Sequence, residues 1–314
     1  MEDIRIFCEN DGKSYSFPMG TDLKTISDRI CPTVACKRTE CETDVLAALV
    51  DNQLKELSFK ALTTHNVRFI GYDHPDGRRS YIRALWIVLQ NVIRVMYPDK
   101  VLAIDYSLPS GLYCEIREKD ELYDGRPKVY FATDDEIEKI QNRMKEIIQS
   151  DLPFKKTKQT LEDAVKLFES NGQKEKVILA RSLGRISYSV YFLDGQADTF
   201  HGPLTPSTGY LKTFDLSGFN NGFCLQYPMD GSYGKVLPMK RQSKLAGALK
   251  EHSDWCAIMD VKGVGSLNQT VRDGKIIDLI NLSEALHERK YADIADQIYA
   301  RRGSVKIVFI AGPS

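Results

Sequence analysis

The chain has 314 residues, which at ~150 residues per domain predicts two domains, or three. Hydrophobic residues make up 42% and charged residues 27%, as in ordinary folded proteins, which argues against a mainly disordered chain. The 43 Lys and Arg residues balance 43 Asp and Glu residues, which argues against a globally basic nucleic-acid binder but leaves a local basic groove open. No apolar run reaches the ~18 residues of a membrane span, and the acidic N-terminus lacks a signal-peptide pattern. These features predict a cytoplasmic protein with no membrane partner.

Seven cysteines are scattered along the chain. A secreted disulfide framework would be denser and usually even in number, so reduced thiols are favoured. Cys31, Cys36 and Cys41 are regularly spaced, but zinc sites typically use cysteines about two to four residues apart and about four ligands in total. Free thiols are therefore favoured over a metal site at this cluster.

Residues 1–70 predict a small α+β domain. Alternating apolar residues on both sides of Asp11-Gly12 predict a β-hairpin. Thr21 is a candidate cap for a short helix that ends before Pro32. Further short strands are expected over residues 45–50 and 67–70. Two strands, a helix and then short strands describe a β-grasp domain.

The same segment resembles the ubiquitin-like TGS domain at the front of threonyl-tRNA synthetases. The resemblance rests on the run from Val45 to Leu57, on the hairpin turn and on Gly20-Thr21-Asp22-Leu23. Asp51 stands where that family usually has Asn, and residues 31–42 form a longer loop than usual. The resemblance implies a TGS domain over residues 1–70.

Residues 71–240 predict a second α+β unit. Helical periods run over 80–97, 133–149 and 160–170. Thr133 with Glu136 forms a capping box at the second of these helices, and Thr160 caps the third. Strands are expected over residues 101–106 and 112–116, and short β segments from 177 to 238.

This segment resembles the second additional domain of threonyl- and alanyl-tRNA synthetases, which edits mischarged tRNA. The resemblance rests on the stretch Gly111 to Glu115, at the place of a Gly-x-Tyr motif, and on Thr199 to Leu204, at the place of a Cys-x-Gly-Pro-His motif. The fold class implied is α+β: a TGS β-grasp domain, then an editing-like α+β domain, then a helical connector.

Residues 241–303 predict that connector, with Ser283 as the cap of a helix ending at Gly303. The last segment, 304–314, is an apolar β-like run followed by Gly312, Pro313 and Ser314. A strand that enters such a turn is how a P-loop begins, although the later Gly and Lys of the motif are missing.

The order of these segments resembles bacterial uridine (nucleoside) kinases. That resemblance implies that the chain stops at the start of a P-loop, with Gly312, Pro313 and Ser314 as its first nucleotide-binding residues. ATP and Mg would then bind in a kinase domain beyond this segment, a nucleoside and ATP would be the partners, and the segment alone would be inactive.

In the synthetase editing domain a His-x-x-x-His pair on a helix and a Cys/His pair on a loop are metal-type ligands. The matching positions here hold Arg79, Arg83, Phe200 and Leu204. Arginine does not serve as a routine ligand, so we expect no zinc and no metal-assisted hydrolysis at this site.

The polar residues at matching positions predict a ligand pocket. Two arginines four residues apart share a helix face, and cations around one cleft suit a phosphate or carboxylate. The ligand would be an anionic small molecule or a nucleotide. The alternative is that both arginines pair with nearby carboxylates at the surface. The candidate pocket residues are Arg79, Arg83, Tyr113, Lys176, Asp198 and His201.

Three functions follow from these patterns. The first is the regulatory or ligand-binding part of an ATP-dependent uridine kinase. The second is an RNA-, tRNA- or nucleotide-binding module related to threonyl-tRNA synthetase; RNA is less favoured because no RNA-stacking signature occurs. The third is an editing hydrolase that acts on aminoacyl-tRNA without a metal.

Overall fold

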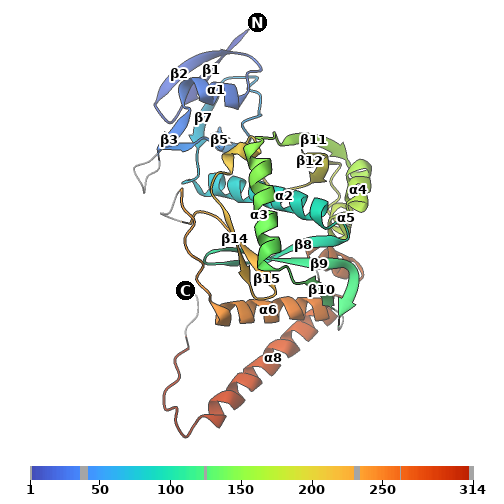
Figure 1. Ribbon diagram of the computed structural model, residues 1–314. Helices are drawn as coiled ribbons and strands as arrows, with labels where there is room; N and C mark the ends of the chain where they lie inside the picture. Colours follow the sequence, from blue (N-terminus) through green and yellow to red (C-terminus); the bar gives the residue numbers. More distant parts are fainter. Residues whose placement is uncertain (1, 36–41, 124–125, 230–233, 262, 311–314) are drawn as a thin grey trace.

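The N-terminal domain is a β-grasp in the computed structural model, which describes residues 2–35, 42–123, 126–229, 234–261 and 263–310 (Figure 1). Strands β1 (Asp3–Cys8) and β2 (Lys13–Pro18) pair antiparallel, with Gly12 at φ +72° in the turn between them. β1 also pairs parallel to β7 (His65–Ile70), which continues to β5 (Ala47–Val50) and β6 (Gln53–Lys55). The hairpin and the later strands predicted from the sequence are confirmed.

Helix α1 (Leu23–Ile30) covers this sheet because Leu23 and Ile26 lie on one face and are fully buried. Its cap is Asp22, whose carboxylate accepts a hydrogen bond from the Thr25 N–H at 2.8 Å. The predicted cap, Thr21, instead donates its hydroxyl to the Pro18 carbonyl oxygen at 2.6 Å. The loop after α1 carries the two short strands β3 (Thr33–Ala35) and β4 (Glu42–Asp44).

Helix α2 (Pro75–Met96) is the central element of the editing-like domain and is buried along much of its length. It begins before the predicted residue 80. Pro75 suits the first helical position, and the His74 ring accepts a hydrogen bond from the Asp76 N–H at 3.2 Å. Sequence periodicity missed this first turn because its residues are polar.

The larger sheet of this domain is antiparallel. Its order is β10 (Arg126–Tyr130), β9 (Gly111–Tyr123), β15 (Gly222–Gln226) and β14 (Asp215–Phe219), and β8 (Lys100–Leu108) also pairs with β9. Helix α3 (Asp134–Gln149) packs beside α2, and its capping box between Thr133 and Glu136 is confirmed. Ile140 and Met144 of α3 join Leu85 and Phe223 in one core.

A smaller sheet holds β11 (Lys155–Thr160), β12 (Ser187–Leu193) and β13 (Gln196–Asp198). Helices α4 (Leu161–Ser170) and α5 (Lys174–Ser182) pack against it, and the short helix η1 (Thr208–Tyr210) follows. The β structure predicted at the start of the 177–238 stretch was wrong. Val177 and Ala180 face the apolar cluster around Phe168 at helical spacing, and this packing overrides the strand propensity of the apolar run.

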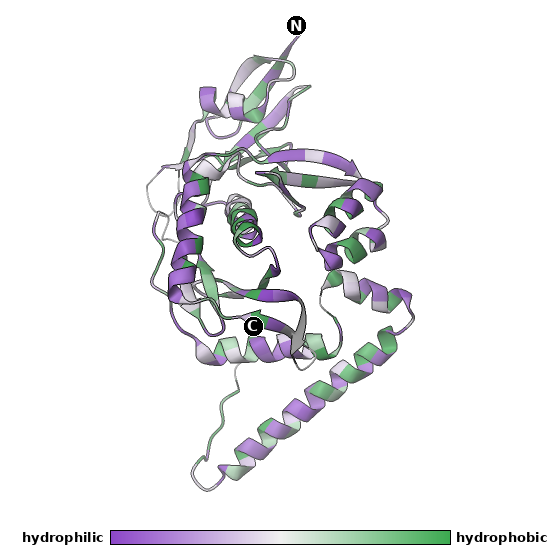
Figure 2. Cartoon of the chain, turned by 45° about the vertical axis from the view of Figure 1, so that its right-hand side comes forward, coloured by the Kyte–Doolittle hydropathy of each residue, from purple (hydrophilic) through white to green (hydrophobic). Residues whose placement is uncertain are grey.

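The connector consists of α6 (Ser243–Ile258), α7 (Val264–Arg272) and α8 (Ile276–Ala300). Ala246 of α6 is fully buried against the larger sheet, and α7 lies against α5. α8 has no buried residue and stands apart from the domains (Figure 2). It begins before Ser283, so that residue lies inside the helix and is not its cap. In the part of the chain the structure describes, each helix is too short or too polar to cross a membrane.

Residues 305–310 form no strand in the described structure, contrary to the sequence prediction. Their apolar side chains are exposed, Phe309 by 90% and Ile310 by 95%. A strand is held by hydrogen bonds to a neighbouring strand, and no ladder reaches this segment within the described ranges.

Candidate functional site

A pocket of about 480 Å³ lies between the β-grasp domain and the editing-like domain. Its walls are the turn after β6, strand β12, helix α5, and the loop of residues 199–203. Four cationic residues line it, and we call it the cationic pocket: Lys55, Lys156, Lys176 and Arg185. The only carboxylate among its described lining residues is Glu56. The pocket therefore carries an excess of positive charge.

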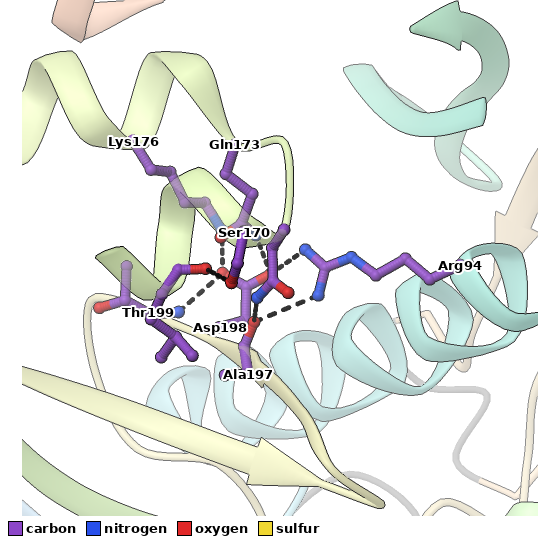
Figure 3. A network of polar contacts seen from close by, with 9 residues as sticks. Arg94, Ser170, Gln173, Lys176, Ala197, Asp198 and Thr199 are labelled. Carbon is purple, nitrogen blue, oxygen red and sulfur yellow. Dashed lines mark hydrogen bonds and ion pairs between the residues drawn. The ribbon is translucent and has the colours of Figure 1, made fainter. Parts of the chain in front are cut away.

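Lys176 and Asp198, both placed in the predicted ligand pocket, form an ion pair in which Asp198 is buried and Lys176 is partly exposed (Figure 3). Asp198 is fully buried at the end of β13, and its carboxylate also accepts hydrogen bonds from the Thr199 N–H at 2.7 Å and from Gln173 at 3.1 Å. Arg94 of α2 lies 3.6 Å away. These four partners fix the carboxylate.

The fixed Asp198 positions the Lys176 ammonium at the edge of the cationic pocket. The Lys176 side chain is 31% exposed and its Nζ lies 5.7 Å from the centre of the Phe200 ring. Burial lowers the pKa of Lys176, and the charge of Asp198 opposes that lowering. A cation held in this way needs little reorganisation to meet an anion.

Arg83 and Arg79 both project from α2, but their side chains lie in different surroundings. Arg83 is half-buried and donates to the Pro203 carbonyl oxygen at 3.3 Å. Gly202 favours this approach, because its φ of +117° is one that other residues rarely adopt and an added Cβ would lie 2.8 Å from the Arg83 guanidinium. Burial lowers the pKa of Arg83, and the nearby charge of Arg79 lowers it further. Arg79 is 61% exposed and pairs with Asp76 at 2.7 Å, which is the surface alternative foreseen for it.

His201 lines the cationic pocket, whereas Tyr113 does not. Tyr113 belongs to the cluster of Phe219 and Ala246, where its hydroxyl donates to Glu115 at 2.9 Å. The structure therefore does not bring Tyr113 to the other predicted site residues. Strand alternation explains the error, since neighbouring residues of β9 face opposite sides of the sheet.

The four positions that correspond to metal ligands do not fit a metal ion. Arg83 contacts the loop, Arg79 points to solvent, Leu204 is 2% exposed in the core, and Phe200 packs against Trp86 with ring centres 5.9 Å apart. None of these side chains is a zinc ligand. Within the described ranges no three His, Cys, Asp or Glu side chains gather as a ligand set.

Sequence reasoning missed the part of the site that the β-grasp domain supplies. Glu56 accepts hydrogen bonds from Lys156 at 2.8 Å and from the Tyr191 hydroxyl. These partners are 100 and 135 residues away in the chain, and no local motif marks a contact between two domains. One sign of this contact between domains is present in the sequence, namely the polar residues of the turn after β6.

Two further predictions fall partly or wholly outside the described residues. Gly312, Pro313 and Ser314, predicted to bind nucleotide, lie outside them, as do Cys36 and Cys41. The described cysteines are free, and the Cys31 sulfur lies 3.3 Å from the Thr33 carbonyl oxygen.

No protein-family model matches the chain. It is similar to the threonine–tRNA ligase of Carboxydothermus hydrogenoformans, with 27% identity over 201 residues, which is 64% of this chain and 29% of that protein. The enzyme of Acetivibrio thermocellus is 27% identical over 66% of this chain, and that of Clostridium kluyveri 28% identical over 68%. The matched region spans about 30% of the length of these relatives.

These similarities correct the kinase interpretation. The curated proteins that match are threonine–tRNA ligases, and nothing among them points to a uridine kinase. The P-loop prediction and the nucleoside and ATP partners that came with it are therefore not supported. Segment order alone misled: residues 305–310 form no strand in the described structure, and Gly312, Pro313 and Ser314 lie outside it.

The architecture agrees with the relatives. The chain has an α+β fold in which a TGS-type β-grasp precedes an editing-like domain and a helical connector, as in the N-terminal regions of threonyl-tRNA synthetases. The chain is a module related to those synthetases in sequence and fold.

Proposed function

We propose that this chain is a cytoplasmic binding module that takes a nucleotide in the cationic pocket, either free or as the end of an RNA, without hydrolysing it. The observation that carries the proposal is the set of four cations around a pocket of about 480 Å³, a volume suited to a small ligand. A nucleotide supplies both the negative charge and the flat base that such a pocket accepts.

The phosphate and the base of a nucleotide would contact different residues of the cationic pocket. Lys156, Lys176 and Arg185 are donors for phosphate oxygens, and charge-assisted hydrogen bonds are among the stronger polar contacts. Phe59, Tyr188 and Phe200 offer aromatic surface to a base, which stacking favours without regard to its identity. His201 lies on the same wall and can donate to the ligand.

The RNA source is supported by the relatives, whose name says that they join threonine to tRNA. The hydrolase alternative has no comparable support. We therefore propose recognition without cleavage.

The test measures binding of AMP and of uncharged tRNA by fluorescence anisotropy or calorimetry at several salt concentrations. We expect both to bind, with affinity that falls as salt rises. Tighter binding of tRNA than of AMP would identify the RNA end as the ligand, and equal binding would identify the free nucleotide. Failure of both to bind at low salt contradicts the proposal.

Two variants localise the binding. Arg185→Met removes an exposed cation of the pocket and is expected to weaken binding about tenfold, the loss of roughly one charge-assisted hydrogen bond. Lys145→Met removes an exposed cation from α3, outside the pocket, and is the matched control. An equal loss in both variants would indicate non-specific attraction and not a site.

A further inference from the structure

Glu56 is the point at which the β-grasp domain enters the cationic pocket. One carboxylate oxygen, Oε1, accepts from the Lys156 ammonium at 2.8 Å and from the Tyr191 hydroxyl. The Glu56 side chain is 15% exposed, and Tyr191 is 2% exposed. Two donors of the editing-like domain thus converge on a single oxygen that belongs to the other domain.

The two donors form a preorganised anion subsite. Lys156 Nζ lies 5.2 Å from the centre of the Tyr191 ring, and the Tyr191 hydroxyl also lies 3.2 Å from the Gly202 carbonyl oxygen. A phenol has one proton to donate, so with Glu56 present that proton goes to its carboxylate. Burial, and after it the charge of Glu56, raises the pKa of Tyr191, which keeps the hydroxyl protonated and able to donate.

Glu56 differs from the other carboxylate near the pocket in how firmly it is held. Asp198 is fully buried and accepts from the Thr199 backbone and from side chains of its own domain. Glu56 lies on a turn that its own carbonyl closes by accepting from the Phe59 N–H at 3.0 Å. Its side chain can rotate away without unfolding the β-grasp core, although the turn then loses its contact with the editing-like domain and opens more often.

A phosphate bound in this subsite would lie closer to the positive side chains than one bound elsewhere in the cationic pocket. With Glu56 in place its carboxylate offsets the charge of Lys156, and with Glu56 displaced Lys156 is free to meet the ligand, while Lys176 keeps its pair with Asp198. Arg83 adds a fifth positive charge nearby, on the loop side of Tyr191. A phosphate with two negative charges is a better partner for this group than a single carboxylate.

We propose that the Lys156–Tyr191 subsite binds the phosphate of the nucleotide, and that Glu56 occupies it in the free protein. The proposal rests on the nucleotide-binding function above and adds its regulation. Binding exchanges Glu56 for phosphate and so releases one ion pair that fixes the β-grasp domain. A second interdomain pair, Lys212 with Asp44 at 2.9 Å, remains, and Leu46 of the β-grasp domain stays packed in the core of the editing-like domain.

The first test is the affinity of AMP for Glu56→Gln, measured by calorimetry. Glutamine keeps the size of the side chain but removes the competing charge, so AMP is expected to bind about fivefold more tightly than to wild type. Glu169→Gln is the control, because it breaks an exposed pair with Arg181 outside the pocket and is expected to leave the affinity unchanged. Adding Lys156→Met to Glu56→Gln should abolish the gain.

The outcomes separate the two proposals. If wild type binds AMP and Glu56→Gln binds no more tightly, the exchange is wrong while nucleotide binding stands. If no variant binds AMP or tRNA, both proposals fail. A gain in Glu169→Gln equal to that in Glu56→Gln would show a general charge effect and would also overturn the exchange.

The second test is hydrogen exchange in the wild-type protein with and without saturating AMP. Displacement of Glu56 predicts faster exchange of amides in the turn of residues 54–59 together with slower exchange near Lys176. Protection of both segments would show that Glu56 stays in contact with its partners, and it would overturn the proposal even if AMP binds.

Discussion

Asp198 holds two cations of the editing-like domain in place from a fully buried position. We expect Asp198→Ala to lower the free energy of unfolding by about 3 kcal/mol, because it leaves Arg94 and the partly buried Lys176 without the carboxylate that balances their charge. Urea denaturation measures the change. The control Glu169→Ala breaks an exposed pair and is expected to cost less than about 1 kcal/mol. Equal losses would mean that the Asp198 network is not stabilising.

Asp51 links the turn after β5 to β7 and gives the β-grasp domain a pH dependence. Its carboxylate accepts from the Asn66 N–H at 2.9 Å and contacts His65 Nδ1 at 2.6 Å. The hydrogen bond from Asn66, and after it that from His65, lowers the pKa of Asp51 below its ordinary value of 3.8. A lowered pKa means that the carboxylate stabilises the fold above that ordinary value and loses this effect as pH falls through the lower folded value.

Asp51→Asn separates the charge from the hydrogen bond. Asparagine keeps an acceptor for the Asn66 N–H and tolerates the positive φ of 49° at this position. We expect wild type to be the more stable protein at pH 5 and the difference to shrink towards pH 3, measured by urea denaturation at both pH values. A difference that is constant or grows as pH falls would contradict this assignment.

At the scale of elements, the N-terminus of α3 depends on its capping box. The Glu136 N–H donates to the Thr133 hydroxyl at 3.3 Å, and the Thr133 N–H donates to the Glu136 carboxylate at 2.9 Å. Thr133→Ala is expected to lower the free energy of unfolding by about 1 kcal/mol. Thr63→Ala, in an exposed loop, is the control and should change it by less than about 0.5 kcal/mol. Chemical denaturation with equal losses would show that the cap contributes nothing.

Elements with a local signal were predictable from the sequence. The hairpin around Gly12, and α3 and α4 with their threonine caps, follow from turn chemistry, side-chain capping and apolar period within a few residues. α5 was not predictable, because its helix is decided by packing against Phe168 and not by its own apolar run. The strand predicted over residues 305–310 was wrong for the opposite reason: the run has strand propensity, but no neighbouring strand among the described residues pairs with it.

The same division applies to the candidate site. Lys176, Asp198, His201 and Arg83 were found because they occupy motif positions of one domain, and the structure brings them to one region. Glu56 and its partners were missed because their contact joins segments that only the packing of two domains brings together. Tyr113 was misplaced because a motif position does not say which face of a strand a side chain occupies.

At the scale of the whole molecule, the two domains and α6 form the stable body, and α8 contributes little to it. α8 has no buried residue and exposes large apolar side chains, among them Ile277, Tyr291 and Ile294. Its side-chain contacts with α6 include the Lys290–Glu251 pair at 2.6 Å and the edge contact of His287 with Trp255. Exposed contacts of this kind contribute at most about 1 kcal/mol.

A chain ended at Gly274, directly after α7, should therefore keep its thermal stability. We expect its Tm, measured by circular dichroism, to lie within about 2 °C of that of the full chain. Ending the chain at residue 240 is the contrasting case, because it also removes α6 and uncovers the sheet beneath the buried Ala246, and it should lower Tm clearly. A drop of more than about 4 °C on removing residues 275–314 would mean that this segment packs against the body far more closely than its exposed side chains indicate.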